Sequence, residues 1–267
     1  MAVKIDETGK RWVSVEVEVP GTPEQVWDAI ATAQGVSSWF VPTEMRDDGT
    51  IVSHFGPGMD SVAKRVLEER PHRFAGESKG WKPGSPPLAT EWIIEARSGG
   101  TCIVRVVHSL FASTDEWDDQ LTGTESGWPS FFRVLKAYLT YFHGQYGATM
   151  QFMISSAQPA APVWSAVSDA LGLTGASVGE RRKAPTGVPP FAGIIEFVGQ
   201  DGPHKEQMVL RLDEPTRGLA HVYVMSMGPK SLVLMRVFLY GDQAAAAVAR
   251  DEPLWNARLN ELFKATV

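Results

Sequence analysis

Histidine is the residue in this sequence best suited to acid–base or metal chemistry, and the chain has six. None lies in a His-x-x-x-His or His-Glu-x-x-His pattern, the spacings that place two imidazoles on one helix face around a zinc ion. His108 is the most informative, because it belongs to an alternating segment with one apolar face. If that face points inward, its imidazole is a structural hydrogen-bonding group, a ligand contact or a general base, and the sequence leaves these roles open. The face comprises Cys102, Val104, Val106, His108 and Leu110.

Other groups capable of catalysis are weaker candidates. The chain has one cysteine, Cys102, which excludes an internal disulfide and a cysteine-based zinc site. Its place within an apolar alternating segment favours a small buried residue over a nucleophile. The sequence contains no Walker A motif and no Gly-x-Gly-x-x-Gly motif. We therefore predict no catalytic residue, no metal ligand and no cofactor.

Large aromatic side chains form the second group that could build a site. The first half contains more of them than one small core requires, so they either pack against one another or line a cavity, and both interpretations remain open. Strand parity places Trp92 and Ile94 on one face, opposite Glu91 and Glu95. We predict a ligand cavity lined by Trp39, Phe40, Phe55, Phe74, Trp81, Trp92, Ile94, Val104, Val106, His108, Trp128, Phe132 and Leu135.

Two short charged runs have a simpler interpretation. Residues 115–119 (Asp-Glu-Trp-Asp-Asp) bring carboxylates close together, which a metal or acid–base site would need, but a solvated loop is the better prediction. The basic run 181–183 (Arg-Arg-Lys) lies in a Gly- and Pro-rich stretch and is also predicted to be a solvated loop.

Charge and composition exclude several classes of protein. The chain of 267 residues has 25 basic and 31 acidic residues, hence a net charge of −6. Residues 1–147 hold 14 basic and 20 acidic residues, so the excess charge is in the first half. An acidic first half argues against binding a nucleic-acid backbone. No apolar run reaches the ~18 residues of a membrane span. The free thiol and the charged N-terminus without a signal-like segment predict a cytoplasmic protein.

The first half is predicted to begin with a strand and a capped helix. Valines alternate with polar residues over 13–19, the period-two pattern of a half-buried strand. Thr22 then caps a helix, with Pro23 at its first position and Gln25 completing a capping box. A long amphipathic helix carries the apolar residues of 128–142, with Pro129 in its first turn. Five further strands lie between these helices, at about 50–55, 61–69, 72–78, 90–97 and 101–111.

The second half repeats this order in reduced form. A strand at about 149–154 precedes a helix at about 160–171, which Gly172 terminates. A final helix follows at about 243–264. The copies share a Val-Trp-x-x-(Ile/Val) helix phrase, so the pattern predicts two domains, 1–147 and 148–267. The count is six strands in the first half and five in the second, the last four at about 193–199, 205–212, 219–227 and 231–240.

Strands in hairpin succession without βαβ alternation predict antiparallel sheets. One long helix must cover the apolar face of each sheet, and a curved sheet around one helix leaves space for a ligand. The predicted fold class is α+β, with two domains, each a curved antiparallel sheet wrapped around a long C-terminal helix; the resemblance described next implies that these are helix-grip domains.

Five phrases in the first half occur in the order of a known family. The sequence resembles the START-type, birch-pollen-allergen-like (SRPBCC) superfamily, and within it the group named after the activator of heat-shock-protein ATPase. The second half resembles it only through 163–164 (Val-Trp), the closing hairpin and the terminal helix, as a diverged second copy. The phrases are Pro-Glu-Gln-Val-Trp-Asp-Ala-Ile at 23–30, Trp-Phe-Val-Pro at 39–42, and the segments 66–74, 99–109 and 127–128.

The resemblance implies a helix-grip fold with a cavity between the sheet and the C-terminal helix. It also implies several functions, because such folds bind lipids, sterols, hormones and polyketides, some are cyclases or dehydratases, and the named relatives are co-chaperones. We predict a cytoplasmic protein that binds a small hydrophobic molecule in the first domain, with a protein partner as a further option. The alternatives are a cyclase-, dehydratase- or hydrolase-like enzyme using the same cavity, and a co-chaperone-like interaction module.

Overall fold

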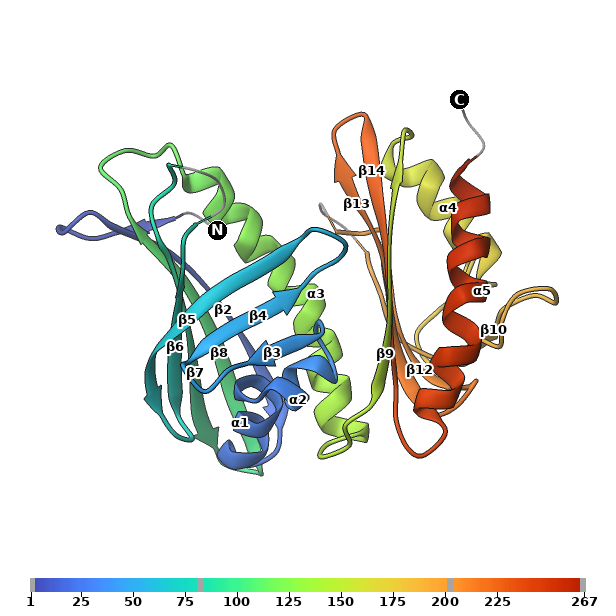
Figure 1. The fold of residues 1–267 in the computed structure, drawn as a ribbon, viewed down its shortest axis with the longest axis horizontal. Coiled ribbons are helices and arrows are strands. Elements are labelled where there is room, and N and C mark those ends of the chain that lie inside the picture. Colours follow the sequence, from blue (N-terminus) through green and yellow to red (C-terminus); the bar gives the residue numbers. More distant parts are fainter. Residues whose placement is uncertain (1–2, 81–83, 201–203, 265–267) are drawn as a thin grey trace. The chain divides into compact units, whose positions relative to one another are not determined.

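The computed structural model describes residues 3–80, 84–200 and 204–264. The chain divides into two compact units, Met1–Gly144 and Gln145–Val267. The division falls three residues before the boundary expected from the sequence. Each unit is an antiparallel sheet with helices against one face, and each has the helix-grip architecture (Figure 1).

The first unit is built on an eight-stranded sheet in which every neighbouring pair is antiparallel. The strand order is β1-β2-β8-β7-β6-β5-β4-β3. The sheet curves around α3, which packs against β2 and β8 (Figure 1). The strands are β1 (Lys4–Ile5), β2 (Lys10–Pro20), β3 (Thr43–Met45), β4 (Thr50–His54), β5 (Asp60–Glu69), β6 (Arg73–Ser78), β7 (Leu88–Arg97) and β8 (Thr101–Phe111).

Two short helices, α1 (Pro23–Ala31) and α2 (Ala33–Ser37), follow β2. The predicted capping box at Thr22 is present: its side chain accepts from the Gln25 amide and the Gln25 side chain accepts from the Thr22 amide. The buried face of α1 includes Val26, Trp27 and Ile30, the apolar side chains of the helical pattern.

The long helix α3 (Asp118–Tyr141) begins ten residues earlier than predicted. The prediction that Pro129 lies in its first turn is therefore wrong, because Pro129 lies inside the helix. The prediction of a loop over 115–119 is wrong for Asp118 and Asp119, which form the first helical turn, where carboxylates favour the positive end of the helix dipole. Arg11 also fixes this end, since its guanidinium donates to both carboxylate oxygens of Asp118 at 2.7 and 2.5 Å.

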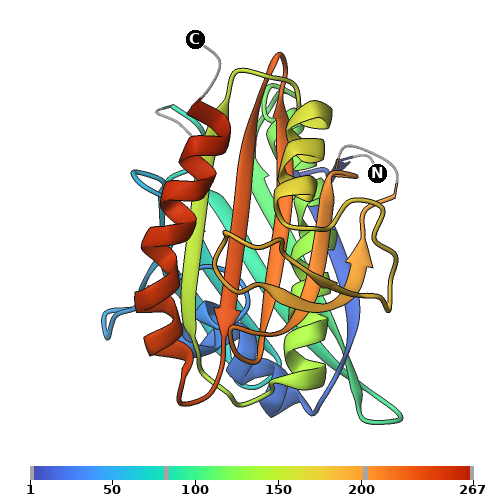
Figure 2. The ribbon, with the colours of Figure 1, turned by 90° about the vertical axis from the view of Figure 1, so that its right-hand side faces the viewer.

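The second unit repeats the strand order of the first in a shorter sheet, β10-β11-β12-β13-β14-β9. Its helices α4 (Ala160–Ala170) and α5 (Ala244–Lys264) cover one face, with α5 along β9 and β14 (Figure 2). Gly172 adopts a φ of 68° just after α4, which is the left-handed conformation expected of a residue that terminates a helix. The strands are β9 (Ala148–Ser156), β10 (Arg181–Lys183), β11 (Ala192–Val198), β12 (Gln207–Glu214), β13 (Gly218–Met227) and β14 (Lys230–Leu239).

The sequence undercounted the strands, which number eight and six in the described residues rather than six and five. The missed strands β1, β3 and β10 have two or three residues each, too few for an alternating pattern to emerge. The prediction of a solvated loop at 181–183 is wrong, because these residues form the short strand β10. Arg181 and Lys183 lie at an exposed sheet edge and form ion pairs with Asp213 and Glu214.

Candidate functional site

A continuous series of aromatic rings lies between the eight-stranded sheet and the helices of the first unit. Trp27 on α1 packs edge-on against Phe74 at a centroid distance of 5.5 Å, and Phe74 stacks on Trp92 at 6.0 Å. Trp92 packs edge-on against Trp128 of α3 at 5.0 Å. Trp128 in turn stacks on Phe40 at 5.4 Å. The series therefore connects α1, β6, β7 and α3 through ring contacts.

The structure places twelve of the thirteen predicted cavity residues, and Trp81 lies outside the described residues. Phe40, Phe55 and Trp92 are half-buried. Trp39 is buried and donates its indole N–H to the Ala29 carbonyl at 2.9 Å, which gives this ring a structural role. Two rings of the cluster, Trp27 and Phe131, were absent from the sequence prediction. The buried members are Trp39, Phe74, Ile94, Val104, Val106, His108, Trp128, Phe132 and Leu135.

His108 points inward, as its strand pattern predicted, and both of its ring nitrogens are occupied. Trp128 Nε1 donates to His108 Nε2 at 2.6 Å, and Nδ1 lies 3.0 Å from the hydroxyl of Thr90. Burial lowers the pKa of His108 to about 4, so the imidazole is neutral at pH 7. An indole N–H can only donate, so Nε2 accepts and the proton resides on Nδ1, which donates to Thr90. Of the three roles considered for His108 (structural group, ligand contact or general base), this geometry matches the structural one. Neither ring nitrogen is free to act as a base.

Arg65 on β5 is an inward-facing residue that the sequence prediction missed. Its guanidinium carbon lies 5.4 Å from the centre of the Phe74 ring, and Nη2 donates to the Ala31 carbonyl at 2.8 Å. Nη1 pairs with Glu68 at 2.8 Å. Nε is buried and has no hydrogen-bond partner among the described residues. Strand parity did not reveal this residue, because a pattern with the apolar Val62 inward places Arg65 outward, whereas Val62 is more than half exposed.

Strand register aligns four of these positions across the sheet. Arg65 on β5 is opposite Gly76 on β6, Gly76 is opposite Thr90 on β7, and Thr90 is opposite His108 on β8. Directly opposed residues point to the same face of a sheet, so all four face the interior. This set of four, the polar row, combines a guanidinium, a position without a side chain, a hydroxyl and an imidazole.

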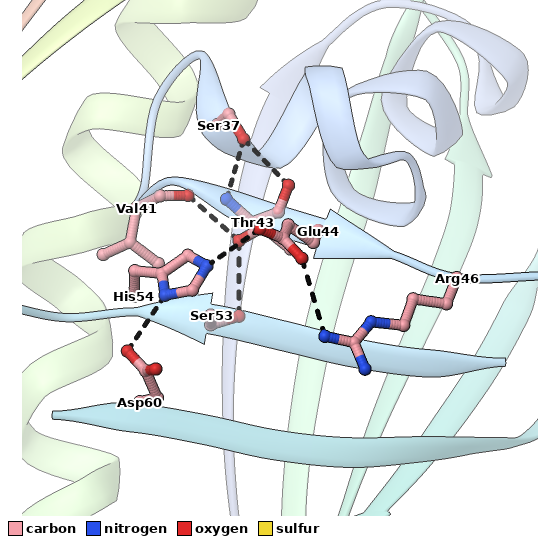
Figure 3. Close-up of polar contacts among 8 residues, drawn as sticks. All are labelled: Ser37, Val41, Thr43, Glu44, Arg46, Ser53, His54 and Asp60. Carbon is pink, nitrogen blue, oxygen red and sulfur yellow. Dashed lines mark hydrogen bonds and ion pairs between the residues drawn. The ribbon is translucent and has the colours of Figure 1, made fainter. Parts of the chain in front are cut away.

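A second polar group lies on the outer face of the same sheet, around His54 (Figure 3). His54 Nδ1 is 2.9 Å from Asp60 Oδ1, and Nε2 is 3.6 Å from Glu44 Oε1. These carboxylates raise the pKa of His54, Asp60 more than Glu44. Each nitrogen faces a different carboxylate and the side chains are exposed, which suits a surface ion-pair group rather than a catalytic dyad.

The remaining nucleophile candidates lack a suitable environment. Cys102 is fully buried, its Sγ lies 3.3 Å from the Gly21 carbonyl, and burial raises the pKa of the thiol. The segment 175–179 has the Gly-x-Ser-x-Gly spacing of a hydrolase nucleophile elbow, which the sequence prediction missed. Its Ser177 is exposed in a turn before β10, whereas an elbow joins a strand to a helix.

The second unit has a separate open groove beside α5. It has a volume of about 680 Å³ and lies between loop 187–190 and one flank of the helix. Its charged side chains are already paired, Arg250 with the buried Asp251 at 2.7 Å and Arg258 with Glu261 at 3.2 Å. The groove is therefore mixed in polarity, without a dominant charge.

Within residues 3–80, 84–200 and 204–264, no three His, Cys, Asp or Glu side chains are grouped to hold a metal ion. In the same ranges, no helix is both long and apolar enough to span a membrane.

Comparisons with known proteins give one family match. Residues 20–140 match the family described as Activator of Hsp90 ATPase homolog 1-like protein. No curated protein matches the sequence.

Several solved structures are similar at low identity. The Aha1 dimer from Colwellia psychrerythraea is 19% identical to this protein, with a TM-score of 0.40. The match covers 49% of this chain and 96% of the Aha1 chain. DynU16, from the dynemicin biosynthetic locus, is 17% identical over 95% of this chain and 98% of that chain, with a TM-score of 0.41. BexL, a di-domain ARO/CYC from the BE-7585A biosynthetic pathway, is 16% identical over 95% and 96% of the two chains, with a TM-score of 0.43.

Proposed function

We propose that the chain, whose residues 20–140 match the model of the activator of Hsp90 ATPase homolog 1-like family, is a cytoplasmic protein that binds a small apolar or aromatic molecule. The site is the interior of the first unit, between the eight-stranded sheet and α3. The observation that carries the proposal is the ring series from Trp27 through Phe74 and Trp92 to Trp128, which concentrates aromatic side chains in this interior.

The energetics of such a site are favourable without any specific polar contact. A ligand that buries ~300 Å² of apolar surface gains about 7 kcal/mol at ~25 cal/mol per Å². The loss of translational and rotational freedom offsets several kcal/mol of that gain. The remainder of roughly 3–4 kcal/mol corresponds to binding in the millimolar range. Contacts between a flat ligand and an aromatic side chain such as Trp92 would add to this gain.

The test uses an uncharged flat probe, 2-acetonaphthone, titrated into the full-length protein while tryptophan fluorescence and native mass spectra are recorded. We expect saturable one-to-one binding. We also expect Trp92→Leu to weaken binding about tenfold, because Trp92 lies at the centre of the ring series and Leu has no aromatic face.

The matched control is Phe111→Leu, which removes an aromatic ring that is 65% exposed at the end of β8. This variant should bind the probe as the wild type does. If the probe fails to saturate up to its solubility limit, or if both variants bind equally well, the interior of the first unit is not an aromatic binding site.

An enzymatic use of the same interior is less favoured, because a general base needs a free lone pair and His108 has none. A co-chaperone-like role would instead use a protein partner, as the family description suggests. Neither alternative has an observation as direct as the ring series.

A further inference from the structure

The polar row offers hydrogen-bond donors to the interior. The acceptor nitrogen of His108 is occupied by the indole N–H of Trp128. His108 then donates its Nδ1 proton to Thr90, which leaves the hydroxyl hydrogen of Thr90 as the group free to donate. Arg65 contributes Nε–H, which is buried and has no acceptor among the described residues. A molecule that satisfies this row must therefore supply acceptor oxygens.

Gly76 carries no side chain between these two donors. Its position is directly between Arg65 and Thr90 in the register, so the two flanking Cα atoms are about 10 Å apart, two strand spacings of about 4.8 Å. A Cβ added at Gly76 would meet nothing closer than 3.6 Å, the Ala63 Cβ and the Lys64 carbonyl. The glycine is therefore not required by backbone packing, and a methyl group can be introduced there without a clash.

The charge at this position favours an anion over a neutral oxygen. Arg65 carries a guanidinium group, and its carboxylate partner Glu68 is 45% exposed. A planar guanidinium with a free Nε–H is suited to a carboxylate, which accepts charge-assisted hydrogen bonds. The neighbouring rings of Phe74 and Trp92 would contact the apolar body of the same molecule.

We propose that the first unit binds an aromatic or apolar carboxylic acid, with its carboxylate above Gly76, between Arg65 Nε and the hydroxyl of Thr90. The inference rests on the proposed function, because it assigns the polar end of the ligand to the same interior.

The experiment compares two probes of one shape in the full-length protein at pH 7.5. 2-Naphthoate carries a carboxylate, and 2-acetonaphthone replaces one oxygen with a methyl group and has no charge. The wild type should bind 2-naphthoate at least tenfold more tightly. Arg65→Gln and Thr90→Val should each reduce this preference at least fivefold. Gly76→Ala should weaken the binding of 2-naphthoate about tenfold, because the added methyl group would occupy the position proposed for the carboxylate.

Three variants serve as matched controls. Arg73→Gln removes an arginine paired with Glu91 on the opposite face of the sheet, Thr90→Ser keeps the hydroxyl, and Gly123→Ala adds a methyl group where α3 has open space. All three should keep the preference for 2-naphthoate. If Arg65→Gln fails to fold, the carboxylate site is still tested by comparing the two probes on the wild type, Thr90→Val and Gly76→Ala.

The outcomes separate the two proposals. Equal affinity of the wild type for both probes, or a preference that persists in Arg65→Gln, Thr90→Val and Gly76→Ala, would overturn the carboxylate site while leaving an aromatic site in place. Failure of both probes to bind would overturn the proposed function itself.

Discussion

At the scale of single residues, two histidines of the first unit have opposite relations to pH. His108 is buried in its neutral form with a pKa of about 4, whereas the carboxylates around His54 raise the pKa of that exposed imidazole. The unfolded chain protonates both near pH 6.5. On acidification His108 therefore favours unfolding, and His54 favours the folded state.

We predict that His108 accounts for much of the stability lost on acidification. The unfolded state binds one more proton than the fold between the ordinary pKa of 6.5 and the folded pKa of about 4. This stability is complete above pH 6.5 and falls by about 1.4 kcal/mol per pH unit below it, about 3 kcal/mol by pH 4. His108→Gln can accept from Trp128 and donate to Thr90. Urea unfolding from pH 7.5 to 4 should therefore show a flatter profile for this variant.

The comparison variant for this prediction is His54→Gln. The fold raises the pKa of His54 in the wild type. The stability that His54 contributes is therefore present below pH 6.5 and is lost as the pH rises through the pKa of the folded state. This variant should cost more stability at pH 5.5 than at pH 8. Parallel pH profiles for the wild type and His108→Gln would contradict the assignment of a buried neutral imidazole.

At the scale of elements, β5 differs from the hydrophobic pattern of its sequence. Val62 and Val66 are both more than half exposed, while Arg65 faces the interior. The cross-strand neighbour of Arg65 is Gly76. The register shifts after Arg65, which leaves Val66 without a partner in the ladder, the signature of a β-bulge.

The start of α1 gives a prediction at this scale. Thr22→Ala removes the side-chain oxygen that accepts from the Gln25 amide at 3.3 Å and breaks the capping box. The free energy of unfolding should fall by about 1 kcal/mol. Urea denaturation followed by circular dichroism measures it. Thr122→Ala, at an exposed position within α3, should cause no loss, and an equal loss in both variants would show that the cap contributes nothing.

At the scale of the whole molecule, one strand order occurs twice. The order β9-β14-β13-β12-β11-β10 repeats β2-β8-β7-β6-β5-β4 of the first unit, and each set ends with a long helix against the sheet. The family match and the ring series both lie within Met1–Gly144, so the first unit holds the elements that the proposed site requires.

We predict that residues 1–144 fold without the rest of the chain. Helix α3 covers the inner face of its own sheet, and the buried rings Trp27, Phe132 and Trp128 lie in this unit. The isolated unit should unfold cooperatively in urea and give a near-ultraviolet circular dichroism spectrum of ordered tryptophans. A spectrum without fine structure, or unfolding without a cooperative transition, would show that the unit does not fold independently.

Much of the fold could be predicted because its signals are local. Period-two alternation in β2 and β8, the capping box at Thr22 and the aromatic stripe of α3 each lie within a few turns or a single strand. The start of α3 was misplaced, because Pro129 resembles a helix start and the ion pair of Asp118 with Arg11 joins residues far apart in the sequence. The sequence did not predict the short strands β1, β3 and β10, because their hydrogen-bonded pairing with a neighbouring strand defines them rather than an alternating sequence pattern.

Periodicity and the order of elements along the chain were enough to predict an α+β fold, its twofold repetition and the inward direction of His108, and the family resemblance added the helix-grip class. The hydrogen bonds at both nitrogens of His108, and the row that it shares with Arg65, Gly76 and Thr90, became visible only in the folded chain. The physical reason is that register between strands and contacts across a core depend on pairs of residues separated along the chain, and no local pattern specifies such pairs.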